Sequence, residues 1–181
     1  MLNKYIKNRI VRGVLEWALC LAIAFLIFLI IDNFVMKSAR VYGSSMEPTF
    51  GHHDRVIINR FVYLFWEPQA GDIIAFPYAA DTSQHYIKRI IGVPGDIMDM
   101  RDGFIYRNGI RLDDEFSEDR VFSGTAFFPM FVEEDTYFVL GDNRRVSEDS
   151  RFSEVGNISR RDIIGRITFR WLPFNKIGFV N

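Results

Sequence analysis

The sequence predicts a mainly β protein, built of antiparallel coiled sheets or an irregular β-barrel, with one N-terminal transmembrane helix. Two observations predict this class. Beyond residue 40 the chain consists of short runs rich in Val, Ile, Tyr and Phe, which are bounded by Gly, Pro, Asp and Asn. Before residue 40 it carries one long apolar run without an internal charge. The length of 181 residues allows one domain with its own core plus an extra segment.

The apolar run extends from Trp17 to Ile31, and with its flanks it covers residues 14–36. A helix of that length crosses the roughly 30 Å hydrocarbon layer of a bilayer. Four basic residues precede the run within the first twelve positions, whereas only two closely follow it. The positive-inside rule therefore predicts that residues 1–13 are cytoplasmic and that residues 37–181 lie on the extracytoplasmic face of the cell membrane.

Two other interpretations of the run are less favoured. A cleavable signal peptide needs small residues one and three positions before the cut. Cutting after Ala39 would place Lys37 in the outer position, and cutting after Ser38 would place Met36 there. A buried core helix is disfavoured because the run is apolar on every face and has a basic flank. We expect an uncleaved anchor in contact with lipid.

The β-rich region contains five segments with strand-like composition. They cover residues 55–59, 72–76, 86–92, 136–141 and 163–172. Asn108-Gly109, between two further strand-like runs, predicts a hairpin with a type I′ turn. Residues 113–131 are unpatterned and are expected to form a long loop or insertion. The aromatic segment 60–68 is either exposed, where it could rest on a membrane interface, or a buried strand and turn.

Charge and cysteine content exclude several classes of protein. The net charge is −1, and the basic N-terminus leaves about −5 for the rest of the chain, which does not suggest a nucleic-acid binder. The single cysteine, Cys20, excludes an internal disulfide and a multi-cysteine metal site. We expect neither a metal nor an organic cofactor. The sequence leaves the oligomeric state open.

Two adjacent serines, Ser44 and Ser45, stand where the chain enters a Met-Glu-Pro-Thr turn. A serine hydroxyl becomes a good nucleophile only when a neighbouring base takes its proton. His52 and His53 are expected in an exposed turn, and His85 at the start of a strand. No Gly-x-Ser-x-Gly elbow supports a Ser-His-Asp triad.

Lysine is the other candidate base. Lys88 lies in the strand-like segment "YIKRIIGVPGD", where Tyr86, Lys88 and Ile90 share one face. Lowering the pKa of a lysine from about 10.4 to about 8 requires roughly 3 kcal/mol against its charged form, which burial can supply. Taken alone, the segment favours a different interpretation, an edge-strand lysine that limits aggregation.

Four segments occur in order after the anchor: "GSSMEPTF", "GDIIAF", "YIKRIIGVPGD" and "GDNRRVSEDSR". Together they resemble the type I signal peptidases from about residue 40 to residue 170. The resemblance implies a membrane-anchored serine endopeptidase that removes N-terminal signal peptides from exported preproteins. It also implies cleavage after small-x-small sites of the Ala-x-Ala type.

The resemblance assigns roles to individual residues. Ser45, the serine immediately before Met, is the implied nucleophile, and its backbone N–H is an implied oxyanion donor. Lys88 is the implied base. Ser147 is expected to hydrogen-bond the lysine ammonium, and Asp149 to pair with Arg151 through a two-pronged contact that holds the loop.

The sequence departs from the family pattern in two places. Arg145 and Val146 stand where similar enzymes often have Asp-Asn. Gly43 stands where some members carry a serine whose hydroxyl assists the oxyanion. The second oxyanion donor is therefore expected to be a backbone N–H or the side chain of Ser44.

The residues that flank these motifs are expected to line the substrate site. Val41, Tyr86 and Ile87 are the candidates, and each could instead belong to the core. Two other functions stay open from the sequence. One is a catalytically silent membrane-anchored binding module. The other is a self-cleaving regulator with a Ser-Lys pair, against which a membrane span in place of a DNA-binding segment argues.

Overall fold

The computed structural model describes residues 2–30, 36–78, 81–113, 116, 122 and 124–180. The chain divides into two compact units, residues 1–36 and 37–181. The first unit contains α1 (Leu2–Ile30), in which Val11–Leu29 is long and apolar enough to cross a membrane. On the exposed side of this helix, Arg12 and Glu16 form an ion pair one turn apart.

The predicted end of the membrane span at Met36 is wrong. Met36 begins strand β1 (Met36–Arg40), which is the neighbour of β2 (Arg55–Asn59) in a sheet. Residues 31–35 lie outside the described residues. The five residues of β1, Met-Lys-Ser-Ala-Arg, show no alternation of apolar and polar side chains, so the sequence does not indicate this strand.

The second unit is mainly β, as the sequence predicts, and its larger sheet has eight strands. Their order is β1, β2, β11 (Gly165–Leu172), β3 (Ile73–Tyr78), β4 (Asp81–Gly92), β9 (Thr136–Leu140) and β10 (Ile158–Ser159), and β12 (Gly178–Phe179) pairs with β11. Antiparallel pairs join β2 through β10. The strand path is open among the described residues, so the sheets do not close into a barrel.

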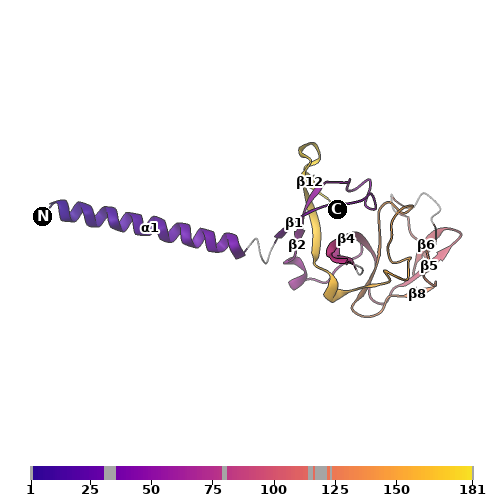
Figure 1. Cartoon of the computed structure of the whole chain (residues 1–181). Helices are drawn as coiled ribbons and strands as arrows, with labels where there is room; N and C mark the ends of the chain where they lie inside the picture. The colour runs from indigo at the N-terminus through magenta and orange to yellow at the C-terminus, as the bar shows by residue number, and fades with distance from the viewer. Residues whose placement is uncertain are drawn as a thin grey trace. The chain divides into compact units, whose positions relative to one another are not determined.

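The smaller sheet has four strands, in the order β7 (Ile110–Arg111), β6 (Phe104–Arg107), β5 (Ile97–Arg101) and β8 (Met130–Phe131). Asn108 and Gly109 join β6 to β7 with φ of 53° and 78°, as a type I′ turn requires. In Figure 1, β5, β6 and β8 lie together, apart from β1, β2 and β12.

The loop expected over 113–131 is wrong at its C-terminal end. Met130 and Phe131 form β8, which pairs with β5 through Met98 and Ile97. Much of the remaining segment, residues 114–115, 117–121 and 123, lies outside the described residues. Two strand residues are too few to produce a recognisable alternation in the sequence, which explains why β8 was missed.

The aromatic segment 60–68 is a turn around a short 3₁₀ helix, η2 (Val62–Leu64). Two further 3₁₀ helices, η3 (Arg160–Asp162) and η4 (Phe174–Lys176), flank β11. Tyr63 is buried and its hydroxyl donates to Asp72, whereas four other apolar side chains are exposed. The exposed residues are Phe61, Leu64, Phe65 and Trp66. The buried-strand interpretation is therefore wrong, and the exposed-aromatic interpretation describes the geometry.

Strand β4 lies between two hydrophobic clusters. Ile87 packs in one cluster with Val41 and other side chains of β2, β3 and β11. Ile90 belongs to the second cluster, against which Tyr86 also packs. The alternation of side chains that the sequence predicts for this strand is therefore confirmed. The strand itself begins at Asp81, five residues before the expected start at residue 86. This central strand carries the lysine singled out above.

Candidate active site

Ser45 and Lys88 meet at the centre of the second unit. Lys88 Nζ lies 2.8 Å from Ser45 Oγ. Ser45 sits in the loop between β1 and β2, and the buried side chains of Val41, Met46 and Phe50 hold that loop against the first hydrophobic cluster. The core thus fixes the serine opposite the lysine of β4.

Burial controls the state of Lys88. The side chain is 2% exposed, and burial lowers its pKa to about 8. The nearby charges of Asp149 and Glu148 act in the opposite direction and raise the pKa, so burial outweighs them. The edge-strand interpretation is wrong, because β4 lies between β3 and β9 and Lys88 pairs across the ladder with Ile74.

The loop between β1 and β2, which carries Ser45, is closed at its base by backbone hydrogen bonds. Val41 N–H donates to the Asp54 carbonyl at 2.8 Å, and His53 N–H donates to the Val41 carbonyl at 2.9 Å. Gly43 has a φ of +83°, a conformation that favours glycine, and its N–H donates to Nδ1 of His52 at 3.0 Å. His52 and His53 are exposed, as expected, and His52 also accepts a hydrogen bond within this loop.

The segment that follows β9 contacts the backbone carbonyl group of Ser45. Asn143 N–H donates to the Ser45 carbonyl at 3.0 Å. A Cβ atom on Gly141 would lie 2.4 Å from the Ser45 carbonyl oxygen and 2.3 Å from Ser147 Oγ. Only glycine allows this approach without displacement of the neighbours.

Asp149 and Arg151 form the two-pronged contact that the sequence predicts. Arg151 Nε lies 2.8 Å from one carboxylate oxygen of Asp149, and a terminal nitrogen of Arg151 lies 2.8 Å from the other. Both side chains are buried. Asp149 also accepts from Gly141 N–H at 3.1 Å, and Arg151 donates to the Ser147 carbonyl at 3.3 Å. The pair thereby ties the ends of this loop together.

The expected hydrogen bond between Ser147 and Lys88 is not formed. Ser147 Oγ is buried and has no hydrogen-bond partner among the described residues. The close approach of Gly141 shows that the Ser147 side chain packs against the backbone there. Lys88 Nζ is engaged with Ser45 Oγ instead.

A second buried ion pair supports the site and was not anticipated. Arg89 makes two contacts of 2.9 Å with the carboxylate of Asp142, which also accepts from Thr49 Oγ1 at 2.5 Å. The network links β4, the segment after β9 and the loop between β1 and β2, which carries Ser45. Its signal in the sequence was the Arg next to Lys88 and the Asp after Gly141, both of which occur within the quoted motifs.

A cavity of about 300 Å³ opens at Ser45 and Lys88. Its other lining residues are Val41, Tyr42, Gly43, Ser44, Met46, His85, Tyr86, Ile87, Val146 and Glu148. All three residues predicted to line a substrate site are present, and Val41 and Ile87 are also core residues. Two basic side chains, Lys88 and His85, border this cavity in the described part of the chain. Lys88 is the one that hydrogen-bonds Ser45 Oγ.

The backbone N–H groups around Ser45 differ in whether a protein acceptor already binds them. Gly43 N–H is already bound to His52, whereas the Ser45 N–H donates to no protein acceptor in the described part of the chain. Ser44 is exposed beside them. Across the described ranges, no group of three or more His, Cys, Asp or Glu side chains is arranged to hold a metal ion.

The chain is similar to known proteins over almost its whole length. A family model described as signal peptidase, peptidase S26, matches residues 14–172. Signal peptidase I S of Bacillus subtilis (strain 168) is 36% identical over 179 residues, which cover 94% of this chain and 95% of that protein. Signal peptidase IB of Staphylococcus aureus (strain MRSA252) is 31% identical over 184 residues, covering 93% and 94%.

A solved structure is also similar. The crystal structure of a signal peptidase I from Enterococcus faecalis V583 is 32% identical and covers 57% of this chain and 98% of that chain, with a TM-score of 0.45. The family match extends over the segments that hold Ser45, Lys88 and the loop from Gly141 to Arg151. The chain therefore belongs to the signal peptidase family, peptidase S26, and is a peptidase.

Proposed function

We propose that this chain is a membrane-anchored serine endopeptidase that removes N-terminal signal peptides from exported preproteins. Ser45 is the nucleophile and Lys88 the general base. The observation that carries the proposal is the 2.8 Å contact between Ser45 Oγ and the buried Nζ of Lys88. Family membership supports the substrate class, because the relatives are named signal peptidases.

The reaction follows from the state of the lysine. Neutral Lys88 accepts the proton of Ser45 Oγ, which attacks the scissile carbonyl carbon and forms a tetrahedral intermediate. The Lys88 ammonium then protonates the amine as the C–N bond breaks and an acyl-enzyme remains. Lys88 is neutral again and accepts a proton from the water that attacks the ester carbonyl carbon. It returns this proton to Ser45 Oγ as the ester C–O bond breaks and the carboxylic acid product leaves. A pKa near 8 leaves enough neutral lysine at neutral pH for the first step.

The oxyanion of the intermediate needs hydrogen-bond donors. We assign the Ser45 N–H, which has no protein acceptor among the described residues, as the first donor. Ser44 is the candidate for the second, because it is exposed and lines the same cavity. The N–H of Gly43 is engaged by His52, which disfavours it as a donor to substrate.

The loop after β9 has a supporting role in this proposal. The buried pair of Asp149 and Arg151 fixes the loop, and Asn143 holds the Ser45 carbonyl. Ser147 contributes a buried hydroxyl without a partner among the described residues. That hydroxyl is available to the Lys88 ammonium that forms after proton transfer, which is the role expected from the resemblance.

Cleavage after small-x-small sites fits the shape of the catalytic cavity. Val41, Met46 and Ile87 supply apolar lining next to Ser45. An extended substrate presents alternate side chains to one face of its binding site, so the residues one and three positions before the cut point the same way. A shallow apolar wall at these positions accepts alanine and excludes large side chains.

The first unit and the exposed aromatics suit a membrane location. The apolar window Val11–Leu29 is the proposed anchor, and the basic residues before it place the N-terminus in the cytoplasm under the positive-inside rule. Phe61, Leu64, Phe65 and Trp66 are exposed on the second unit, where Trp favours a lipid–water interface. Anchoring confines the search for a membrane-embedded signal peptide to a plane.

Cleavage of a detergent-solubilised preprotein with an Ala-x-Ala site tests the proposal, with product ends identified by mass spectrometry. We expect wild type to cut after the second alanine. Ser45→Ala and Lys88→Ala abolish the cut, whereas Ser44→Ala keeps a measurable cut that is slower by about 100- to 1,000-fold, because one oxyanion donor is lost. Activity that survives Ser45→Ala, or wild type that cuts no such preprotein, would support a silent binding module or another nucleophile.

A further inference from the structure

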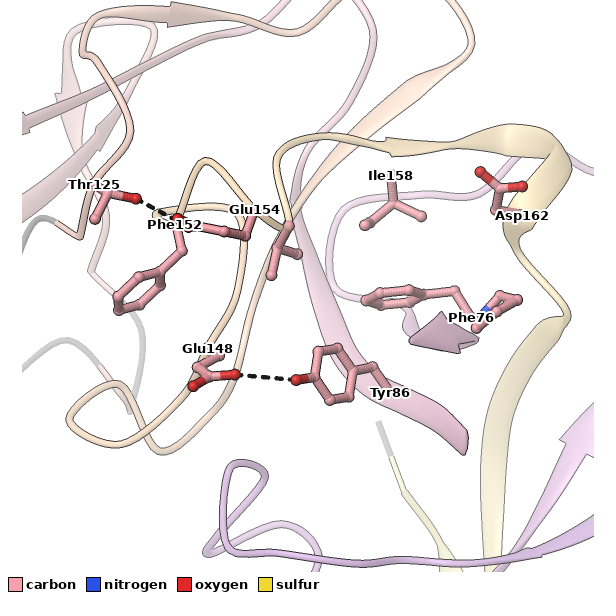
Figure 2. A pocket seen from close by; sticks show the side chains of 10 residues that line it. Phe76, Tyr86, Thr125, Glu148, Phe152, Glu154, Ile158 and Asp162 are labelled. Carbon is pink, nitrogen blue, oxygen red and sulfur yellow. Dashed lines mark hydrogen bonds between the residues drawn. The ribbon is translucent and has the colours of Figure 1, made fainter. Parts of the chain in front are cut away.

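A second cavity lies beside the catalytic one. Its volume is about 390 Å³, and it is lined by Phe76, Pro77, Tyr86, Thr125, Glu148, Phe152, Glu154, Val155, Ile158 and Asp162. Figure 2 shows Phe152 and Thr125 on one side of this cavity, with Phe76, Ile158 and Asp162 on the other. The proposed mechanism does not use it.

Tyr86 and Glu148 form a wall common to both cavities. The Tyr86 hydroxyl donates to a carboxylate oxygen of Glu148 at 3.1 Å, the contact marked by a dashed line between these two side chains in Figure 2. Tyr86 precedes Lys88 by two residues on β4, and both wall residues border the cavity that holds Ser45. A peptide bound at Ser45 therefore passes directly beside the second cavity.

The second cavity combines an apolar interior with acidic side chains. Phe76 and Ile158 are buried, and Phe152 and Val155 are partly buried. Three exposed carboxylates belong to the lining: Glu148, Glu154 and Asp162. This arrangement matches a long side chain with an apolar stem and a cationic end.

The present partners of these carboxylates leave room for a cation. Glu154 accepts from Thr125 Oγ1 at 3.2 Å, and hydrogen bonds from its own backbone and from Thr125 lower the pKa of its carboxyl group. Asp162 has a contact of 3.9 Å with the exposed side chain of Arg161. Glu148 accepts from the neutral hydroxyl of Tyr86. The lining therefore keeps a negative charge next to the substrate path.

We propose that the second cavity binds a lysine or arginine side chain of the substrate, at a position beside the scissile bond. The inference rests on the proposed function, since it takes the occupant to be the peptide that reaches Ser45. Because the second cavity shares a wall with the catalytic cavity, we take its occupant to be a side chain of the substrate. Because carboxylates line the second cavity, we take that side chain to be basic. The stem lies against Phe76 and Ile158 while the cationic end meets Glu154 and Asp162.

Binding to the inactive variant Ser45→Ala tests this inference without requiring cleavage. The probes are fluorescent peptides with an Ala-x-Ala site that carry Lys, Leu or Glu at each flanking position in turn. We expect one position at which Lys improves the Kd about two- to five-fold over Leu, the size of an exposed ion pair, and at which Glu binds worst. Equal binding of the Lys and Leu peptides at every position overturns the inference.

Charge variants in the Ser45→Ala background assign the preference to this cavity. Glu154→Gln should reduce the Lys preference, and Glu154→Lys should reverse it in favour of the Glu peptide. Glu133→Gln, which makes the same charge change at an exposed residue that lines neither cavity, should keep it. A Lys preference that survives Glu154→Lys contradicts the assignment.

The two proposals fail in different ways. If wild type cuts none of the peptides, yet Ser45→Ala binds them with a Lys preference that depends on Glu154, the cavity assignment stands and the proposed reaction is wrong. If wild type cuts the peptides but its Ser45→Ala variant binds Lys, Leu and Glu peptides equally, the reaction stands and the cavity assignment is wrong.

Discussion

Lys88 Nζ and Ser45 Oγ lie 2.8 Å apart although 43 positions separate the two residues in the chain. The serine is held by a loop that packs on one hydrophobic cluster, and the lysine projects from a central strand. Burial opposes the charge of Lys88, and the lowered pKa suits the role of base that we propose for it. The burial of Lys88 should therefore affect both the free energy of unfolding and the rate of cleavage.

Replacing Lys88 with methionine, Lys88→Met, should stabilise the folded protein at neutral pH. The pKa of Lys88 is about 8 when folded and 10.5 by the reference value for the unfolded chain. Below pH 8 both states are protonated, and the folded state carries the full penalty of about 3 kcal/mol. As the pH rises from 8 to 10.5 the unfolded state binds more protons, so wild type gains stability and the gap closes.

Denaturant unfolding of the full chain in detergent, followed by Trp fluorescence at several pH values, measures this gap. Phe61→Leu is a control of comparable size change at an exposed site and should show no such pH dependence. A Lys88→Met variant that is less stable than wild type at pH 7 would contradict the account of a penalised lysine.

Asp149→Asn should destabilise the protein by about 3–5 kcal/mol, because it leaves the buried charge of Arg151 without its counter-ion. Arg101→Gln is the matched control: Arg101 pairs with Asp99 at the surface, and its loss should cost about 0.5 kcal/mol or less. Unfolding free energies from denaturant titration compare the two. Equal small effects would show that the Asp149 pair does not hold the loop.

Gly141→Ala should lower kcat/KM of preprotein cleavage by about 100-fold, because the added methyl group displaces the Ser45 carbonyl or the Ser147 side chain. Gly178→Ala makes the same change where no atom lies within 4 Å of the added Cβ, and should leave the rate within about two-fold. Steady-state cleavage rates test this. Wild-type activity in Gly141→Ala would mean that the loop yields without disturbing the serine.

Local patterns were sufficient to predict several of the longer strands and the turn. The alternation in β4 gave the correct faces for Ile87 and Lys88, and β2 was predicted with its observed bounds, Arg55–Asn59. Asn108-Gly109 predicted the turn between β6 and β7, because few amino acids adopt positive φ at two successive residues. The start of β1 at Met36 was missed because its five residues, Met-Lys-Ser-Ala-Arg, show no alternation of apolar and polar side chains.

Long-range contacts were predictable only where a motif carried them. The pairing of Asp149 with Arg151 was expected from the resemblance of this segment to the type I signal peptidases. The pairing of Arg89 with Asp142 and the contact of Gly43 with His52 depend on how strands and loops return to one another. The expected bond of Ser147 to the lysine failed for the same reason, since the approach of Gly141 sets the packing of that side chain.

The pH dependence of kcat/KM for preprotein cleavage reports the pKa of the base in the free enzyme and so tests whether Lys88 is that base. We expect a rate that rises with pH and levels off above about pH 8, and a Lys88→Arg variant that is inactive throughout, since arginine stays charged. A rise centred near pH 6.5, the ordinary pKa of histidine, or activity retained in Lys88→Arg would contradict it.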